Sequence, residues 1–298
     1  MASLAEWVEG ARPRTLPLSI SAVIAGSAVA MAVGAFHPWR ALLALIVGVA
    51  MQLGVNFAND YSDGVRGTDA KRVGPQRLVG SGAASPRAVE LAAFACFGVG
   101  CLAGLGLVLI TQLWWVIAVG VAIVLAAWFY TGGKHPYGYA GWGDVSVMVF
   151  FGFVAAGGTV LVQTGFSSAW HWGVALVVSI AQGAGACAVL VVNNLRDITT
   201  DAAVGKRTLS VRLGDRGSRV LFVILAIVLL LGSVATAAMT TLYGLLCLAM
   251  LVCLVPAVSI TARGVTGFGL VRALKFTSLA QLIGALGLLV GASVAAFM

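Results

Sequence analysis

Two short acidic segments stand out in a chain that has very few acidic residues. Segment 59–69 reads NDYSDGVRGTD and segment 193–201 reads NNLRDITTD, and each directly follows a long apolar stretch. Together they hold five of the chain's ten Asp and Glu residues: Asp60, Asp63, Asp69, Asp197 and Asp201. Because carboxylates near a membrane are costly to desolvate, gathering half of them at two helix ends indicates that they bind a cation.

The spacing of the polar residues places them on shared helix faces. Asn59 and Asp63 are four residues apart, and Asn193, Asp197 and Asp201 follow one another at the same interval. If the preceding helices continue through these residues, each set projects from one face. All of these ligands are oxygens, which suit Mg²⁺ and not zinc. Mg²⁺ held by a few carboxylates commonly completes its shell with water and substrate phosphate oxygens.

Basic residues follow each acidic segment. Lys71, Arg72 and Arg77 come after the first, and Lys206 and Arg207 come after the second. Cations beside a carboxylate-bound metal neutralise a diphosphate and stabilise it as a leaving group. Solvated loop ion pairs, each contributing little, are the alternative. A random loop would not place acid and base together twice, so the pattern favours a diphosphate site.

The composition identifies the elements that must position these residues. The chain is 60% hydrophobic and 9% charged, with a mean hydropathy of +1.03, whereas ordinary globular chains carry about 25% charged residues. A membrane-spanning helix takes ~20 apolar residues. Nine such spans are predicted, at 14–35, 40–59, 88–110, 113–131, 144–163, 173–193, 218–237, 241–261 and 276–297. We therefore expect one all-α domain, residues 1–298, forming a polytopic helical bundle in the lipid bilayer.

The distribution of positive charge predicts the orientation of the bundle. Nine spans place every one of the 18 Lys and Arg residues on one side except Arg40. By the positive-inside rule that side, with both acidic segments and the active site, is cytoplasmic and the protein lies in the plasma membrane. The net charge of +8 then reflects topology. It does not indicate nucleic-acid binding, because no basic soluble module is present.

The two halves of the chain also share an order of features. Two spans, an acidic helix end and a basic loop occur in 14–87 and again in 144–219. This order predicts a two-fold internal repeat with the site at the interface of the two repeats, as in many membrane folds.

These segments resemble the UbiA superfamily of intramembrane prenyltransferases over nearly the whole chain. Within it they most resemble the 1,4-dihydroxy-2-naphthoate polyprenyltransferases of menaquinone synthesis. The resemblance is carried by NDYSDG at 59–64 with GTD at 67–69, RVGP at 72–75 with GSG at 80–82, YTGG at 130–133, and NNLRD at 193–197 with GKRTL at 205–209.

The resemblance implies Mg²⁺-dependent transfer of a polyprenyl chain from polyprenyl diphosphate to an aromatic carboxylate, 1,4-dihydroxy-2-naphthoate. CO₂ and diphosphate would leave and demethylmenaquinol would form. The implied metal ligands are Asn59, Asp60, Asp63, Asp69, Asp197 and Asp201. The implied catalytic residues are Asp63, Asp144, Asp197, Asp201 and Lys206. The diphosphate and the acceptor would be bound by Asn59, Lys71, Arg77, Tyr130, Lys134, Tyr139, Asn193, Arg196 and Arg207. Asp69 follows Asp63 by six residues where the superfamily has four, so its direct contact with metal stays open.

Three residues in or beside segment 132–143 each have two possible roles. Tyr130 and Tyr139 either shield an allylic cation with their ring faces or are ordinary interfacial aromatics. Asp144 begins a predicted span, so it either orients the acceptor or handles a proton, or it caps the helix.

Two other functions are compatible with parts of the sequence. A secondary transporter would also have Gly-rich spans, a repeat and acidic residues, but transporters place their charges near the bilayer midplane. Here the charged residues lie at or beyond the ends of the predicted spans. A prenyltransferase of the same superfamily acting on 4-hydroxybenzoate, homogentisate, haem or ribose phosphate is the second alternative. The sequence indicates neither the prenyl length nor the oligomeric state.

Overall fold

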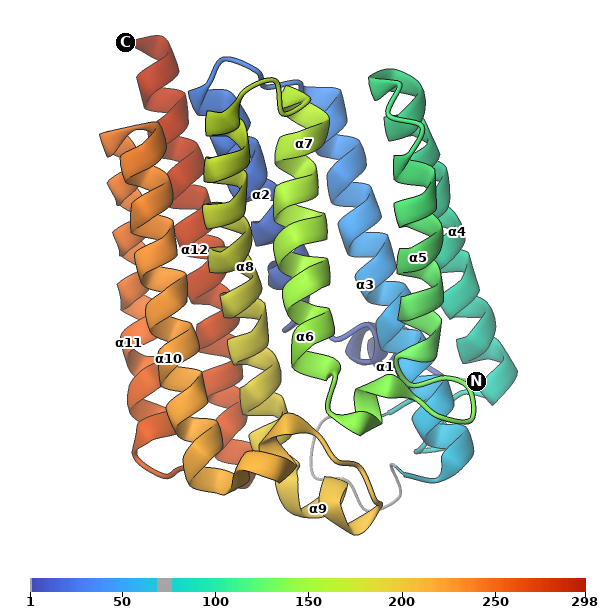
Figure 1. Cartoon of the computed structure of the whole chain (residues 1–298). Helices are drawn as coiled ribbons and strands as arrows, with labels where there is room; N and C mark the ends of the chain where they lie inside the picture. Colours follow the sequence, from blue (N-terminus) through green and yellow to red (C-terminus); the bar gives the residue numbers. More distant parts are fainter. Residues whose placement is uncertain (1, 69–76) are drawn as a thin grey trace.

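The computed structural model describes residues 2–68 and 77–298. Within those ranges the chain is all-helical, as expected from the composition, and the helices stand side by side in one bundle (Figure 1). The two termini lie at opposite ends of the bundle, as an odd number of passes requires. The helices are α1 (Leu4–Gly10), α2 (Leu16–Ala32), α3 (Pro38–Arg66), α4 (Pro86–Thr111), α5 (Val116–Phe129), α6 (Gly143–Val147), α7 (Gly158–Thr164), α8 (Ala169–Arg196), α9 (Ile198–Ala203), α10 (Leu209–Thr240), α11 (Leu251–Ala262) and α12 (Leu270–Phe297).

Four short segments of other helical geometry complete these elements. A π-helical segment, η2 (Met148–Gly157), joins α6 to α7, and the 3₁₀ segments η3 (Leu242–Met250) and η4 (Gly267–Gly269) lead into α11 and α12. The 3₁₀ turn η1 (Tyr137–Ala140) lies in the connection between α5 and α6.

Seven helices of the described chain are long and apolar enough to cross a membrane: Pro38–Arg66, Pro86–Thr111, Gly143–Thr164, Ala169–Arg196, Leu209–Thr240, Leu242–Ala262 and Gly267–Phe297. They match seven of the nine predicted spans. The other two predicted spans correspond to α2 and α5, apolar helices of 17 and 14 residues. At 1.5 Å per residue these are about 25 and 21 Å long, short of the ~30 Å apolar core of a bilayer. Nine passes and the internal repeat therefore stay predictions.

Several helices extend beyond the predicted spans, because hydropathy marks only the apolar part of a helix, and three of these extensions matter for the site. The span predicted at 40–59 continues to Arg66 and ends at Gly67, which has a φ of 71°. The span predicted at 173–193 continues to Arg196. The span predicted at 218–237 begins at Leu209, with a break at Gly214. The extensions of α3 and α8 place residues 59–66 and 193–196 of the two acidic segments on helical turns at the same end of the bundle.

The central helix of the bundle is α8. Of its apolar window 78% is buried, against 33–39% for the six other long helices. It packs against α10, η2, α12 and α2, and Gln281 of α12 donates to the Gln182 backbone oxygen and to its Oε1, at 3.0 and 2.8 Å. Both glutamines are fully buried. This packing holds the end of α8, and so the second acidic segment, in place.

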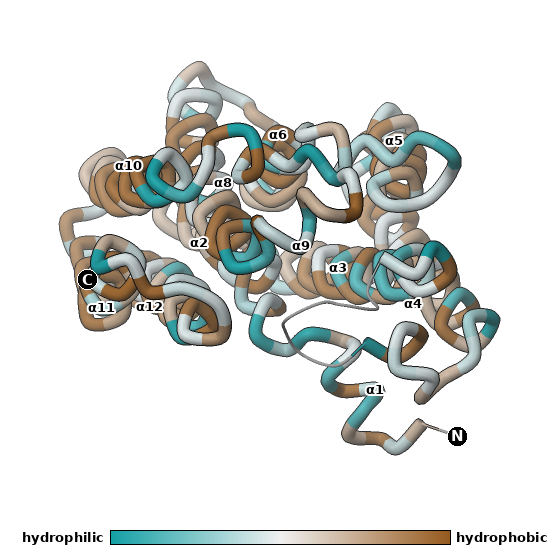
Figure 2. The backbone as a smooth tube through the Cα atoms, turned by 90° about the horizontal axis from the view of Figure 1, so that it is seen from below, coloured by the Kyte–Doolittle hydropathy of each residue, from teal (hydrophilic) through white to brown (hydrophobic). Residues whose placement is uncertain are grey.

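Helices α3, α4 and α5 form a second group, which meets the rest of the bundle mainly through α2. At the end opposite the acidic segments, Arg40 of α3 donates to the backbone oxygens of Val162 and Gln163 at the end of α7, at 2.9 and 3.3 Å. The one basic residue predicted on that side therefore ties two helices together. Figure 2 views the bundle from below, which is the end that carries the acidic segments. Hydrophilic positions gather there in the loops and helix termini, and apolar positions run down the helices.

Candidate functional site

Asp63 is the most highly connected acidic residue of the first segment. It is 4% exposed, on the last turn of α3. Its Oδ1 accepts a hydrogen bond from the Tyr139 hydroxyl and lies 3.4 Å from Lys206 Nζ, and its Oδ2 lies 3.9 Å from an Arg77 guanidinium nitrogen. The Asp63 carboxylate is thus neutralised by two basic residues: Arg77 from the loop after the first segment and Lys206 from the loop after the second.

Lys206 is positioned by contacts between two loops that are far apart in the sequence. The Arg207 backbone nitrogen donates to the Tyr139 oxygen at 2.8 Å, and an Arg212 guanidinium nitrogen donates to the Ala140 oxygen at 2.6 Å. Lys206 Nζ then lies 4.4 Å from the centre of the Tyr139 ring. Burial, and then the nearby Asp63 carboxylate, raise the pKa of the Tyr139 phenol, which stays a protonated donor.

Asn59 joins the end of α3 to the segment after α5. Its Oδ1 accepts from the Thr131 hydroxyl at 2.7 Å. Arg66 donates to the backbone oxygens of Thr131 and Gly133, and its guanidinium lies 5.7 Å from the Tyr139 ring centre. The sequence does not identify Thr131 or Arg66 as site residues. The only signal is that both lie in the segments that carry the family resemblance.

Asp60 has a different environment from Asp63. It is 1% exposed, and its two carboxylate oxygens accept from the Leu78 and Val79 backbone nitrogens at 2.9 and 3.0 Å. Asp60 therefore anchors to α3 the backbone of residues 78–79, which directly follow Arg77. Its predicted contact with metal stays a prediction.

The second acidic segment forms a compact cluster at the end of α8. Asp197 is buried, and its two carboxylate oxygens lie 2.7 and 2.6 Å from Arg196 guanidinium nitrogens. The same guanidinium donates to Asn193 Oδ1 at 2.9 Å. Asp201 is half-buried on α9, and its backbone oxygen accepts from the Lys206 nitrogen at 2.9 Å. Arg196 thus neutralises Asp197 as Lys206 and Arg77 neutralise Asp63.

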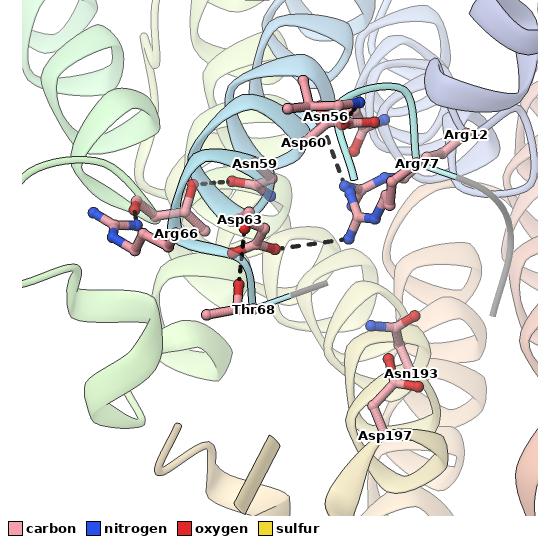
Figure 3. Close-up of polar contacts among 12 residues, drawn as sticks. Arg12, Asn56, Asn59, Asp60, Asp63, Arg66, Thr68, Arg77, Asn193 and Asp197 are labelled. Carbon is pink, nitrogen blue, oxygen red and sulfur yellow. Dashed lines mark hydrogen bonds and ion pairs between the residues drawn. The ribbon is translucent and has the colours of Figure 1, made fainter. Parts of the chain in front are cut away.

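The two clusters face one cavity. Figure 3 shows Asn59 and Asp63 on one helix and Asn193 and Asp197 on another, with Arg77 beside the first pair. Asn59, Arg77, Asn193 and Arg196 all line a cavity of about 1060 Å³. The rest of its wall is mostly apolar and comes from α2, α3, α4, α5, η2, α7 and α8. The arrangement places charged and amide groups at the mouth of an apolar chamber, which suits a molecule with an anionic head and a long apolar tail.

The donor set at this mouth fits Mg²⁺. Carboxylate and amide oxygens come from two helix ends, without thiolate or imidazole among the residues just described. Over residues 2–68 and 77–298, the structure gathers no three Asp, Glu, His or Cys side chains into one cluster. A metal bound here would be held by residues of both helix ends, in place of the cations that now neutralise Asp63 and Asp197.

The remaining predicted site residues lie around this centre or away from it. Tyr130 lines the cavity. Asp144 is the second residue of α6, and its Oδ1 is buried without a hydrogen-bond partner among the described residues. The helix-cap interpretation of Asp144 is wrong, because Trp142 is the N-cap and no side-chain cap bond forms there. Lys134 and Arg207 are exposed. Asp69, Lys71 and Arg72 lie outside the described residues.

The fold and this cavity mouth define an all-helical membrane protein whose cavity suits an amphipathic anion. The sequence model of the UbiA prenyltransferase family matches residues 19–266, so the chain belongs to that family. At the level of particular proteins, it is 55% identical over 222 residues to the 1,4-dihydroxy-2-naphthoate octaprenyltransferase of Mycobacterium tuberculosis (strain ATCC 25618 / H37Rv), covering 74% of each chain. It is 41% identical over 221 residues to the protein of the same name from Escherichia coli (strain K12), covering 72% of this chain and 70% of the other.

Solved structures share the fold. The apo structure of a UbiA homolog from Aeropyrum pernix K1 matches with a TM-score of 0.69 at 14% identity, covering 92% of this chain and 98% of that chain. A UbiA homolog from Archaeoglobus fulgidus bound to GPP and Mg²⁺ matches with a TM-score of 0.61 at 13% identity, covering 96% and 99%. At these identities the likeness establishes the fold alone.

Proposed function

We propose that this protein transfers a polyprenyl chain from polyprenyl diphosphate to 1,4-dihydroxy-2-naphthoate, releasing diphosphate and CO₂ and giving demethylmenaquinol for menaquinone biosynthesis. The observation that carries this proposal is the 55% identity to the M. tuberculosis enzyme with that acceptor. The cavity supports the proposal independently of this sequence identity, because its polar mouth suits an anionic head group and its apolar wall suits a long isoprenoid tail.

The head of the donor binds at the mouth of the cavity. Asn59 and Asp63 from α3, with Asp197 at the end of α8 and Asp201 from α9, are the residues that would hold Mg²⁺. Asn193 of α8 would contact the substrate beside them. The A. fulgidus homolog, solved with GPP and Mg²⁺, supports this cofactor. When bound, the metal neutralises the diphosphate and stabilises it as a leaving group. Lys206 and Arg77, which contact the Asp63 carboxylate in this structure, would then contact the diphosphate instead. Asp60 and Asp69 keep their predicted roles in support of the metal shell, and Lys71 keeps its predicted contact with the diphosphate.

The reaction balances without removal of a ring proton. The allylic C–O bond breaks and its electron pair leaves with the diphosphate. The ring carbon that bears the carboxylate forms the new C–C bond, and the bond to the carboxylate then breaks, returning its pair to the ring as CO₂ leaves. A base for a ring proton is therefore not needed. This favours a role for Asp144 in orienting an acceptor hydroxyl through its buried Oδ1. Tyr130 and Tyr139 shield the allylic cation.

The isoprenoid tail lies in the apolar part of the cavity, between the α3–α5 group and the rest of the bundle. In the complete topology α2 and α5 also cross the bilayer, which makes nine passes. The mouth of the cavity then opens on the cytoplasmic side of the plasma membrane, as the positive-inside rule requires.

The nearest alternative function is transfer of the prenyl chain to an acceptor other than 1,4-dihydroxy-2-naphthoate. It is disfavoured because relatives at 55%, 51%, 41% and 40% identity share the naphthoate name. A relative from Synechocystis at 27% identity is named 2-carboxy-1,4-naphthoquinone phytyltransferase, which keeps the same ring system.

The test is prenyl transfer by purified protein in detergent, using octaprenyl diphosphate and acceptor labelled at its carboxyl carbon, with and without Mg²⁺. We expect labelled CO₂ and demethylmenaquinol only with metal. Asp63→Asn keeps an oxygen for the Tyr139 hydroxyl and should be folded but inactive. Metal-independent product, or full activity of Asp63→Asn, would contradict the metal assignment. Donor binding without product would contradict the acceptor.

A further inference from the structure

The cavity runs along most of the length of α3. Its lining residues on this helix extend from Asn59 at the mouth to Ala44 near the far end. Fifteen residues at 1.5 Å each give a depth of about 22 Å. Trp115, at the start of α5, and Trp172 of α8 line the far end and are 56% and 60% exposed. The chamber is therefore a deep trough with a polar mouth and an aromatic far end.

Gly104 and Gly120 in the wall of this trough have no packing reason to be glycine, and Gly158 of α7 is open in the same way, with only the Phe153 backbone oxygen at 4.0 Å from an added Cβ. A Cβ added at Gly104 of α4 would have Val47 Cγ2, at 3.9 Å, as its nearest neighbour, and a Cβ at Gly120 of α5 would meet nothing within 4 Å. Other glycines of the wall differ. A Cβ at Gly100 would lie 3.0 Å from Met51 Sδ, and one at Gly157 would lie 2.5 Å from Ser179 Oγ. Neither Gly104 nor Gly120 has a positive φ, so their backbone conformation does not require glycine either.

Gly104 and Gly120 lie in the deep half of the trough. Gly104 is level with Val47, which is twelve residues from Asn59 along α3, or about 18 Å from the mouth. Gly120 is ten residues from Tyr130, or about 15 Å along α5. A large side chain at either position would project into the deep half and leave the mouth unchanged.

We propose that Gly104 and Gly120 determine donor chain length, because their missing side chains leave room for the distal part of a long isoprenoid tail. This inference rests on the proposed function, since it takes the occupant of the trough to be the tail of a prenyl diphosphate. A short tail ends before these positions, and a long tail passes them.

The test uses Gly104→Leu and Gly120→Leu, with Gly98→Leu as the matched control. Gly98 is exposed on the same helix as Gly104, its added Cβ would also meet nothing within 4 Å, and it does not line the cavity. We expect kcat/KM for octaprenyl diphosphate to fall about tenfold or more in the two wall variants. Geranyl diphosphate should be used within about twofold of wild type, as a tail that ends short of the substitution loses no contact. Gly98→Leu should leave both values unchanged. Gly104→Ala should show a smaller loss in the same direction, which removes the dependence on a folded Leu variant.

Binding of geranyl and octaprenyl thiodiphosphates, measured without acceptor, separates this inference from the proposed function. Loss of octaprenyl binding alone in the wall variants supports the inference even with a different acceptor. Equal losses for both lengths, unchanged octaprenyl binding, or the same loss in Gly98→Leu would overturn it. A wild-type protein that binds both donors but transfers neither to the naphthoate would overturn the proposed acceptor only.

Discussion

At the scale of single residues, Lys206 connects the two acidic segments. It lies in the loop after the second segment and contacts the carboxylate of the first, 3.4 Å from Asp63 Oδ1. Both side chains are largely buried, 12% and 5% exposed, so water and salt screen this contact less than they screen a surface ion pair. In the proposed function the same ammonium group would be available to the diphosphate, because a metal at Asp63 would take over the neutralisation of that carboxylate.

Lys206→Ala should therefore weaken use of the donor more than use of the acceptor. A charge-assisted hydrogen bond contributes about 1.5–3 kcal/mol, so we expect the KM for donor to rise at least about tenfold. Arg216→Ala, which removes an exposed cation at the same end of the bundle, is the control. Steady-state kinetics with each substrate varied in turn would decide the matter, and a rise confined to the KM for acceptor would contradict the assignment.

Asp60 offers a second residue-scale prediction. Asp60→Ala leaves the Leu78 and Val79 amides without their carboxylate acceptor, which should cost about 1–3 kcal/mol. Hydrogen exchange at these two amides should become faster than in wild type. Exchange that stays as slow as in wild type, combined with loss of Mg²⁺ binding, would show that Asp60 is a ligand and not an anchor.

The sequence predicts the chemistry of the site better than its contacts. Asp63, Lys206 and Asn193 can be named from spacing and motif, because their types and intervals are local properties. The bonds of Asn59 to Thr131 and of Arg66 to Gly133 join residues 72 and 67 positions apart. Such pairs depend on how α3 and α5 pack, and a single sequence does not contain that information.

At the scale of elements, the break in α10 determines where the second basic loop lies. Gly214 has φ 70° and ψ −178°, a region that is essentially confined to glycine. The turn before it begins at Thr208, whose hydroxyl accepts from the Val211 nitrogen. This short turn follows Lys206 directly and carries Arg212, which bonds to Ala140. Hydropathy alone starts the span after this turn, because the residues before Gly217 are too polar to face lipid.

Gly214→Ala should be destabilising and should also weaken donor binding. The strained conformation costs about 1–3 kcal/mol for a residue with a Cβ, and relaxation of the turn would displace Lys206. Gly98→Ala, in the middle of exposed α4, should be neutral or slightly stabilising. Thermal unfolding and donor KM measured on both variants test this prediction, and a Gly214→Ala protein that matches wild type in both would contradict it.

At the scale of the whole molecule, composition and charge predict a great deal. Apolar length identified the seven long helices, and the orientation predicted from charge asymmetry stays a prediction. The central position of α8 and the separation of the α3–α5 group could not be predicted, because both depend on which helix faces meet. The shortness of α2 and α5 was equally hidden, since apolar residues continue past the ends of both helices.

Nine passes require the two termini to lie on opposite sides of the membrane, with the N-terminus on the cytoplasmic side. Reporter fusions at each end, compared in intact cells and in inverted vesicles, would test whether the number of passes is odd. A reporter at the N-terminus should be protected in cells and one at the C-terminus should be exposed. Both reporters on the same side would mean an even number of passes, so that α2 or α5 does not cross.

The central claim is that the helix ends of α3 and α8 form one metal and diphosphate site at the mouth of the cavity. The most direct measurement is a double-mutant cycle on Mg²⁺-dependent binding of farnesyl thiodiphosphate, using Asp63→Ala, Asp197→Ala and the double variant. We expect each single change to weaken binding by at least about tenfold, and the double variant to bind no more weakly than the weaker single variant. Losses that add in free energy would show two independent sites and would contradict the claim.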